Sequence, residues 1–226
     1  MANASNVILV PGAWADGSSW SKVIPLLLAR RLRVTAVQLP LTSLKDDAAT
    51  VKRALALADG PTVLVGHSYG GAVITEAGND PKVAGLVYIA AFAPDVGQSA
   101  GSLGASAEPA PIGLEVRPDA AGFLKLTEAG VKNDFAQDLS PAEKNLLFAA
   151  QAPTAAAALG ENVSTAAWKT KPSWYLVATN DRAIQPSLER AMAKTIKAKA
   201  VEVAASHVAM LARPQETADL ILEAVG

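Results

Sequence analysis

Short, mostly apolar runs alternate along the chain with longer segments in which apolar residues recur every three to four positions. A run of about four to eight apolar residues bounded by turn residues is typical of a strand buried on both faces of a sheet. The runs predicted to be strands are residues 6–11, 32–39, 62–65, 83–91, 172–178 and 200–204. The segments with helical periodicity are residues 18–30, 46–58, 72–77, 186–196 and 214–225.

This alternation stops between residues 95 and 168. That segment opens with a stretch rich in Gly, Ser, Ala and Pro, which extends to residue 111. Helical periodicity then follows in residues 120–135, 141–151 and 154–159. We therefore expect an insertion built from helices, without a strand of the kind found on either side of it.

Alternating strands and helices predict an α/β fold, with about six mostly parallel strands and helices on both faces of the sheet. A length of 226 residues fits one such domain with an insertion. We assign residues 1–94 and 169–226 to the core and residues 95–168 to a small helical lid inserted after strand four. Binding sites in such sheets lie at the carboxyl ends of the strands, so chemistry is expected in the loops there.

Composition removes several functional classes. The chain has 20 Lys and Arg against 21 Asp and Glu, a net charge of −1, and this balance argues against nucleic-acid binding. No apolar run reaches the ~18 residues that a membrane span needs. With no cysteine there is no disulfide framework and no thiolate metal site, and we expect no metal. Residues 1–6 lack a basic region, so we expect no signal peptide and a cytoplasmic location.

The strongest motif is Gly66-His67-Ser68-Tyr69-Gly70, which matches the G-x-S-x-G nucleophile elbow. In this motif a sharp turn between a strand and a helix lifts the serine hydroxyl above the sheet. An apolar run precedes the motif here, and a helical segment follows it. Ser68 is therefore the candidate nucleophile.

A serine nucleophile needs a base, and the chain has only two histidines. His67 lies on the elbow itself, where its side chain should point away from Ser68 and serve a structural role. His207 follows the last strand and is the candidate base. Asp181, in the loop after strand five, is the candidate to orient His207, and Asp95, after strand four, is the alternative.

An oxyanion intermediate needs two hydrogen-bond donors. One should be the backbone N–H of Tyr69, the residue after the nucleophile. The other should come from the loop after strand one, where Gly12 allows close approach of the backbone. We choose the backbone N–H of Ala13 for that second donor.

These motifs resemble the α/β-hydrolase superfamily, and in particular a branch with plant methyl-salicylate esterases, hydroxynitrile lyases and bacterial pyrethroid-type esterases. The resemblance extends over nearly the whole chain. It rests on residues 9–14 with Trp20, on Leu39-Pro40, on residues 65–71, on Thr179-Asn180-Asp181, and on residues 207–211 with Pro214. It implies a triad of Ser68, Asp181 and His207, oxyanion donors at Ala13 and Tyr69, a helical lid over residues 95–168 and no cofactor.

Two chemistries occur within this branch. Its lyases have Thr at the position of Gly12 and Lys directly after the catalytic histidine, where this chain has Val208. The resemblance therefore favours ester hydrolysis over cyanohydrin cleavage. Pro11 departs from the family, which usually has His before that Gly, and the difference bears on the oxyanion loop and the pocket rim.

The sequence predicts the class of reaction more specifically than it predicts the substrate. With a net charge of −1 there is no strong field to attract a charged ligand, so we expect an uncharged small-to-medium carboxylic ester. Trp14, Gly12 and Phe123 are the candidate pocket residues. Two other functions stay open: a ligand receptor on a hydrolase frame with little turnover, and an enzyme of the hydroxynitrile-lyase type.

Overall fold

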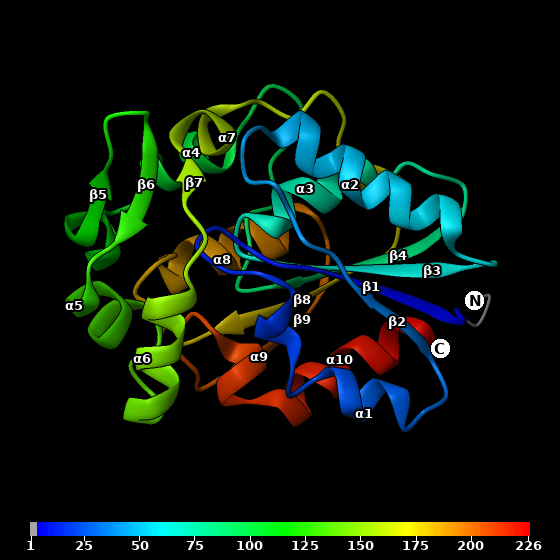
Figure 1. Ribbon diagram of the computed structural model, residues 1–226. Coiled ribbons are helices and arrows are strands. Elements are labelled where there is room, and N and C mark those ends of the chain that lie inside the picture. The colour runs from blue at the N-terminus through cyan, green and yellow to red at the C-terminus, as the bar shows by residue number, and fades with distance from the viewer. Residues whose placement is uncertain (1–3) are drawn as a thin grey trace.

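The computed structural model describes residues 4–226, and its centre is a sheet of six parallel strands (Figure 1). In spatial order the strands are β2 (Arg33–Ala36), β1 (Asn6–Val10), β3 (Thr62–His67), β4 (Val83–Ile89), β8 (Ser173–Ala178) and β9 (Lys199–Val203). Each predicted run overlaps one of these strands, so the predicted α/β fold is confirmed. Part of the segment used to argue against a signal peptide, residues 1–3, lies outside the described residues.

Successive residues of the central strands point to opposite faces of the sheet. In β1, Ile8 and Val10 pack in one hydrophobic cluster while Val7 and Leu9 pack in the other. All five residues of β1 are buried, which explains why the strand reads as a continuous apolar run. One face is covered by α2 (Leu44–Leu57), α3 (Gly70–Ala77) and α8 (Pro186–Thr195), and the other by α1 (Ile24–Leu28), α9 (Ala209–Ala212) and α10 (Pro214–Val225) (Figure 1).

The first predicted helix is interrupted. Residues 18–30 form a short 3-10 helix, η1 (Gly17–Trp20), and then α1, which begins only at Ile24. Pro25 explains the break, because proline has no N–H to donate to the preceding turn and fits best at the start of a helix. The second predicted helix begins slightly earlier than expected, because Ser43 caps α2 by accepting the N–H of Asp46 at 3.0 Å.

The segment between β4 and β8 is not wholly helical. It contains a three-stranded antiparallel sheet, β5 (Val116–Pro118), β6 (Phe123–Leu126) and β7 (Thr154–Ala155). Its helical elements are α4 (Ala100–Ala105), η2 (Pro111–Glu115), α5 (Glu128–Gly130), η3 (Val131–Phe135), α6 (Pro141–Ala150), α7 (Ala156–Gly160) and η4 (Ala167–Lys169). The prediction of a helix across 120–135 is therefore wrong for residues 123–126, which pair with the nearby β5 and with the more distant β7.

The strand order reverses between β1 and β3, which lie side by side at the centre of the sheet. The chain leaves β1 toward β2 on one side and returns to β3 on the other. The loops after β1 and β3 therefore lie at the switch point of the sheet, where ligands bind in open α/β sheets. No helix within residues 4–226 is long and apolar enough to cross a membrane.

Candidate active site

Ser68 occupies a strained turn between β3 and α3. Its φ is 54°, a left-handed conformation that residues other than glycine rarely adopt. A Cβ on Gly66 would lie 2.5 Å from the carbonyl oxygen of Gly70, and one on Gly70 would lie 2.5 Å from that of Pro11. Neither position has room for a side chain, so the two glycines allow the turn that holds Ser68 above the sheet.

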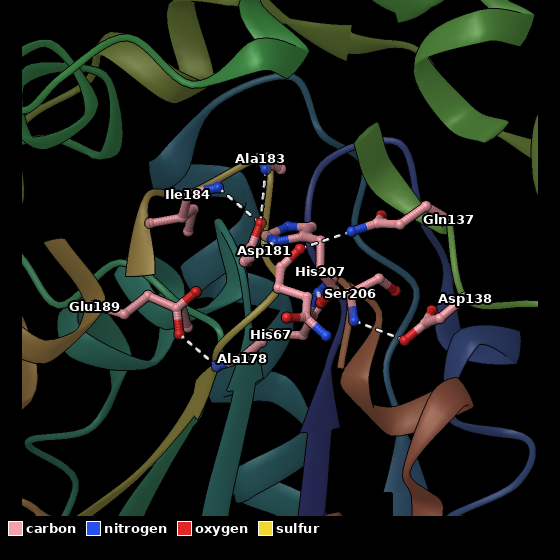
Figure 2. Close-up of polar contacts among 12 residues, drawn as sticks. His67, Gln137, Asp138, Ala178, Asp181, Ala183, Ile184, Glu189, Ser206 and His207 are labelled. Atoms are coloured by element: carbon pink, nitrogen blue, oxygen red, sulfur yellow. Dashed lines mark hydrogen bonds and ion pairs between the residues drawn. The ribbon is translucent and has the colours of Figure 1, made fainter. Parts of the chain in front are cut away.

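His207 and Asp181 meet at the same end of the sheet. The Nδ1–H of His207 donates to Oδ2 of Asp181 over 2.6 Å, and both side chains are buried (Figure 2). The other carboxylate oxygen, Oδ1, accepts the backbone N–H groups of Ala183 at 2.6 Å and Ile184 at 2.9 Å. Because Nδ1 is occupied, Nε2 is the ring nitrogen of His207 left for a proton from Ser68.

Asp181 remains ionised despite its burial. Burial alone would raise its pKa, but the adjacent His207 and the hydrogen bonds to the carboxylate together hold the pKa below its usual range. The alternative acid, Asp95, forms an exposed ion pair with Lys169. The structure therefore brings Asp181, and not Asp95, to His207.

The two predicted oxyanion donors have unoccupied backbone N–H groups. Within residues 4–226, neither the N–H of Ala13 nor that of Tyr69 donates to a protein acceptor. Both residues line the same cavity as Ser68 and His207. Donors left free beside the nucleophile are suited to bind an oxyanion.

Trp14 fixes the loop that contains Ala13. Its φ is 60°, so Trp14, like Ser68, adopts a left-handed conformation. Its backbone N–H donates to Oγ1 of Thr154 at 3.1 Å, and its indole N–H donates to the carbonyl oxygen of Leu124 at 3.0 Å. Both acceptors belong to the small sheet of the insertion, so β6 and β7 hold the loop after β1 in place.

A cavity of about 150 Å³ opens at Ser68. Its lining is almost wholly apolar and includes no charged side chain apart from the titratable His207. Residues from four parts of the chain line it: Ala13, Trp14, Ser68 and Tyr69; Phe92, Ala100, Gly101, Gly104 and Ile112; Leu159; and Ala183, Ile184 and His207.

Of the three predicted pocket residues, only Trp14 lines this cavity. A Cβ on Gly12 would lie 2.6 Å from Cβ of Ser68, so Gly12 packs behind the nucleophile. Phe123 lies in β6, packs against the hydrophobic cluster on the α2 face and is not among the residues that line this cavity. Sequence reasoning missed the small residues of α4 and Leu159, because small residues in a helix have no pattern that marks them as a pocket wall.

His67 supports the loop of His207 from below. Its ring is fully buried, and its Nε2–H donates to the main-chain oxygen of His207 over 2.9 Å. Burial, followed by the neighbouring His207 ring, lowers the pKa of His67 to about 3, so the ring is neutral. This confirms the expectation of a hydrogen-bonded structural histidine.

The insertion also contacts the two loops that bear Asp181 and His207. The side chain of Gln137 donates to the main-chain oxygen of Asn180 at 2.6 Å, and Asp138 accepts the N–H of Ser206 at 2.7 Å (Figure 2). Asn180 directly precedes Asp181 in the sequence, and Ser206 directly precedes His207. The segment after η3 therefore helps to set the separation of these loops. Residues 4–226 contain no cluster of three His, Cys, Asp or Glu side chains suited to a metal ion.

Known proteins resemble this chain along nearly its whole length. Residues 7–220 match the alpha/beta hydrolase family. A pyrethroid hydrolase of Sphingobium wenxiniae is 26% identical over 97% of this chain and 87% of its own length. A probable hydrolase of a Phoma species is 28% identical over 97% of this chain and 98% of its own.

The fold has a matching solved structure as well. The crystal structure of a pyrethroid hydrolase from Sphingobium faniae superposes with a TM-score of 0.84, at 25% identity, over 98% of this chain and 97% of the other. These relatives support the esterase branch that the motifs resembled. The family match covers nearly all of the sheet and the surrounding helices. The chain therefore belongs to the alpha/beta hydrolase family.

Proposed function

We propose that this protein is a serine esterase that cleaves an uncharged small-to-medium carboxylic ester through an acyl-enzyme on Ser68. The observation that supports this most directly is the 2.6 Å hydrogen bond from His207 to Asp181, formed beside the strained Ser68. A buried carboxylate that fixes the histidine tautomer leaves Nε2 ready to act as a base.

The reaction follows from these positions. His207 Nε2 takes the Ser68 hydroxyl proton as Oγ attacks the ester carbonyl, and the N–H groups of Ala13 and Tyr69 stabilise the resulting oxyanion. Each such donor typically lowers the barrier by ~3 kcal/mol. The C–O bond to the alcohol then breaks, and His207 returns the proton to the departing oxygen. Water, deprotonated by His207, attacks the acyl-enzyme and releases the carboxylic acid and Ser68.

The cavity supports the substrate class. Its apolar lining favours an uncharged group, and about 150 Å³ favours a compact one. Ala100, Gly101, Gly104, Ile112 and Leu159 supply part of the wall from the segment between β4 and β8. We infer that this segment, residues 95–168, acts as a lid on a core formed by residues 1–94 and 169–226.

The two alternative functions receive less support. Val208 is buried directly after His207, so no ammonium group stands there to handle cyanide. The backbone N–H groups of Ala13 and Tyr69 are free to bind an oxyanion beside Ser68, which favours catalysis over ligand binding without turnover. The names of the relatives add pyrethroids to the substrates worth testing.

A panel of p-nitrophenyl esters from acetate to laurate, with a pyrethroid as a further probe, tests the proposal. We expect hydrolysis that favours short acyl chains and disappears in Ser68→Ala. Hydrolysis that survives in Ser68→Ala would overturn the proposed nucleophile. Tight ligand binding by a folded wild-type protein that hydrolyses none of these esters would instead favour the receptor.

A further inference from the structure

Glu189 is a buried carboxyl that the proposed reaction does not use. It lies in α8, its side chain is fully buried, and it is drawn close to Asp181 in Figure 2. Charged residues of an amphipathic helix normally face water, as the next residue, Arg190, does. A carboxyl placed behind the triad acid therefore needs a physical explanation.

The two oxygens of Glu189 have different surroundings. Oε2 accepts the N–H of Ala178, the last residue of β8, at 2.9 Å. Oε1 is buried and receives no hydrogen bond from any donor within residues 4–226. The carboxyl of Asp181 adjoins that of Glu189. A carboxylate in that position would be desolvated, half-satisfied and next to a second negative charge.

The guanidinium of Arg190 lowers the pKa of Glu189, but its effect is smaller than the opposing effects of burial and Asp181. That guanidinium is exposed and bonded through two nitrogens to Glu202, each at 2.8 Å. Tyr175 of β8 also adjoins Glu189, but its hydroxyl donates to the main-chain oxygen of Ala91. The remaining neighbour, Asp181, has the same sign of charge.

Asp181 is the better place for the single negative charge of the pair. It accepts two backbone N–H groups on Oδ1 and the His207 ring on Oδ2, whereas Glu189 accepts one. Burial, and then the negative Asp181, raise the pKa of Glu189 well above its usual range. These directions favour a proton on Glu189 rather than on Asp181.

We propose that Glu189 is a positioning residue of the active site, whose protonated carboxyl donates a hydrogen bond to the carboxylate of Asp181. This inference rests on the proposed serine-esterase function for its catalytic meaning, although the hydrogen bond itself does not depend on it. The bond adds a fourth donor to Asp181. It would fix the orientation of the carboxylate toward His207 and moderate the basicity of Asp181.

Infrared difference spectroscopy tests the protonation state without reference to activity. Glu189→Gln keeps the shape and a donor, and Glu202→Gln is the control for an exposed, ionised carboxylate. Near neutral pH we expect the wild-type-minus-Glu189→Gln spectrum to contain a protonated carboxylic C=O band. The corresponding spectrum for Glu202→Gln should contain carboxylate bands alone. Carboxylate bands alone for Glu189 would overturn the proposal, whether or not the protein proves to be an esterase.

The pH profile of ester hydrolysis tests the positioning role. If Glu189 is neutral, Glu189→Gln leaves the acid limb of kcat/KM where it is. If Glu189 is ionised, removing its charge moves that limb lower by about 1–3 pH units, and the proposal fails. Glu189→Leu lacks the donor, so we expect kcat to fall about tenfold with KM unchanged, and full rescue by Gln. An unchanged kcat in a folded Glu189→Leu protein would also overturn the proposal.

Discussion

The backbone N–H of Trp14 donates to the hydroxyl of Thr154 across 140 positions in the sequence, at a distance of 3.1 Å. Trp14 lies next to the proposed oxyanion donor Ala13, and Thr154 lies in β7 of the insertion. The indole N–H of Trp14 also donates to the carbonyl oxygen of Leu124 in β6. The insertion therefore helps to hold the loop that contains Ala13, and it also contributes residues to the lining of the cavity.

We expect Thr154→Val to impair catalysis more than binding. Valine matches the shape of threonine but leaves the partly buried N–H of Trp14 without an acceptor. An unsatisfied buried donor typically costs 1–3 kcal/mol, so we expect kcat to fall about tenfold or more while KM changes little. Steady-state kinetics on a p-nitrophenyl ester measure this, with the exposed Thr195→Val as control. Equal kinetics for the two variants would argue against a role of Thr154 in the loop.

The two histidines should respond differently to the same substitution. His207→Gln removes the base, so we expect kcat/KM to fall by about 10³-fold or more. His67→Gln keeps a side-chain donor that can reach the main-chain oxygen of His207. We expect it to retain easily measurable hydrolysis. If His67→Gln is inactive and His207→Gln active, the assignment of the base is wrong.

The carboxylates Asp181 and Asp95 give an analogous pair. Asp181→Asn cannot fix the His207 tautomer as a carboxylate does, and we expect a loss of about 10⁴-fold in kcat. Asp95 is exposed and paired with Lys169, so Asp95→Asn should leave kcat within about twofold of the wild type. Parallel measurement of kcat for the two folded variants decides between them. The reverse order would move the triad acid to the loop after β4.

Asp47 should make stability depend on pH. Burial, opposed by hydrogen bonds from Tyr69 and Leu41, raises its pKa to about 6. Because the folded pKa lies above the unfolded one, the contribution of Asp47 to stability is fully present below about pH 4 and is lost as the pH rises to about 6. Asp47→Asn should therefore gain stability relative to wild type over that range, by up to about 2 kcal/mol after screening.

Urea unfolding at the two ends of this range measures the effect. Asp59→Asn, at an exposed carboxylate, is the matched control and should show little pH-dependent difference from the wild type. A difference between Asp47→Asn and wild type that stays constant with pH would show that Asp47 does not titrate in this way.

The sequence predicts the central sheet well because its strands are buried on both faces. β1 and β3 read as unbroken apolar runs for that reason, and Pro214 marks the first residue of α10. The sequence also points to Ser68 and His207 as candidates, because a Gly-x-Ser-x-Gly turn is a local motif and only two histidines compete for the role of base.

The rest depends on contacts between distant residues. Phe123–Leu126 forms a strand because it pairs with Val116–Pro118 and Thr154–Ala155. Its own short apolar pattern is equally compatible with a helix. The cavity wall formed by Gly101 and Gly104 likewise leaves no periodic pattern. The burial of Glu189 is also unpredictable from sequence, because acidic residues in a helix usually face solvent.

Mass spectrometry of the trapped acyl-enzyme tests the central claim most directly. The wild-type protein and the variants Ser68→Ala and His207→Ala are each mixed with p-nitrophenyl acetate, quenched in acid and digested. We predict one acetyl group on the wild-type peptide that contains Ser68, and none there in either variant. Rapid hydrolysis that leaves no such adduct and is undiminished in Ser68→Ala would contradict the account. An acetyl group on another residue, formed at the rate of turnover, would contradict it as well.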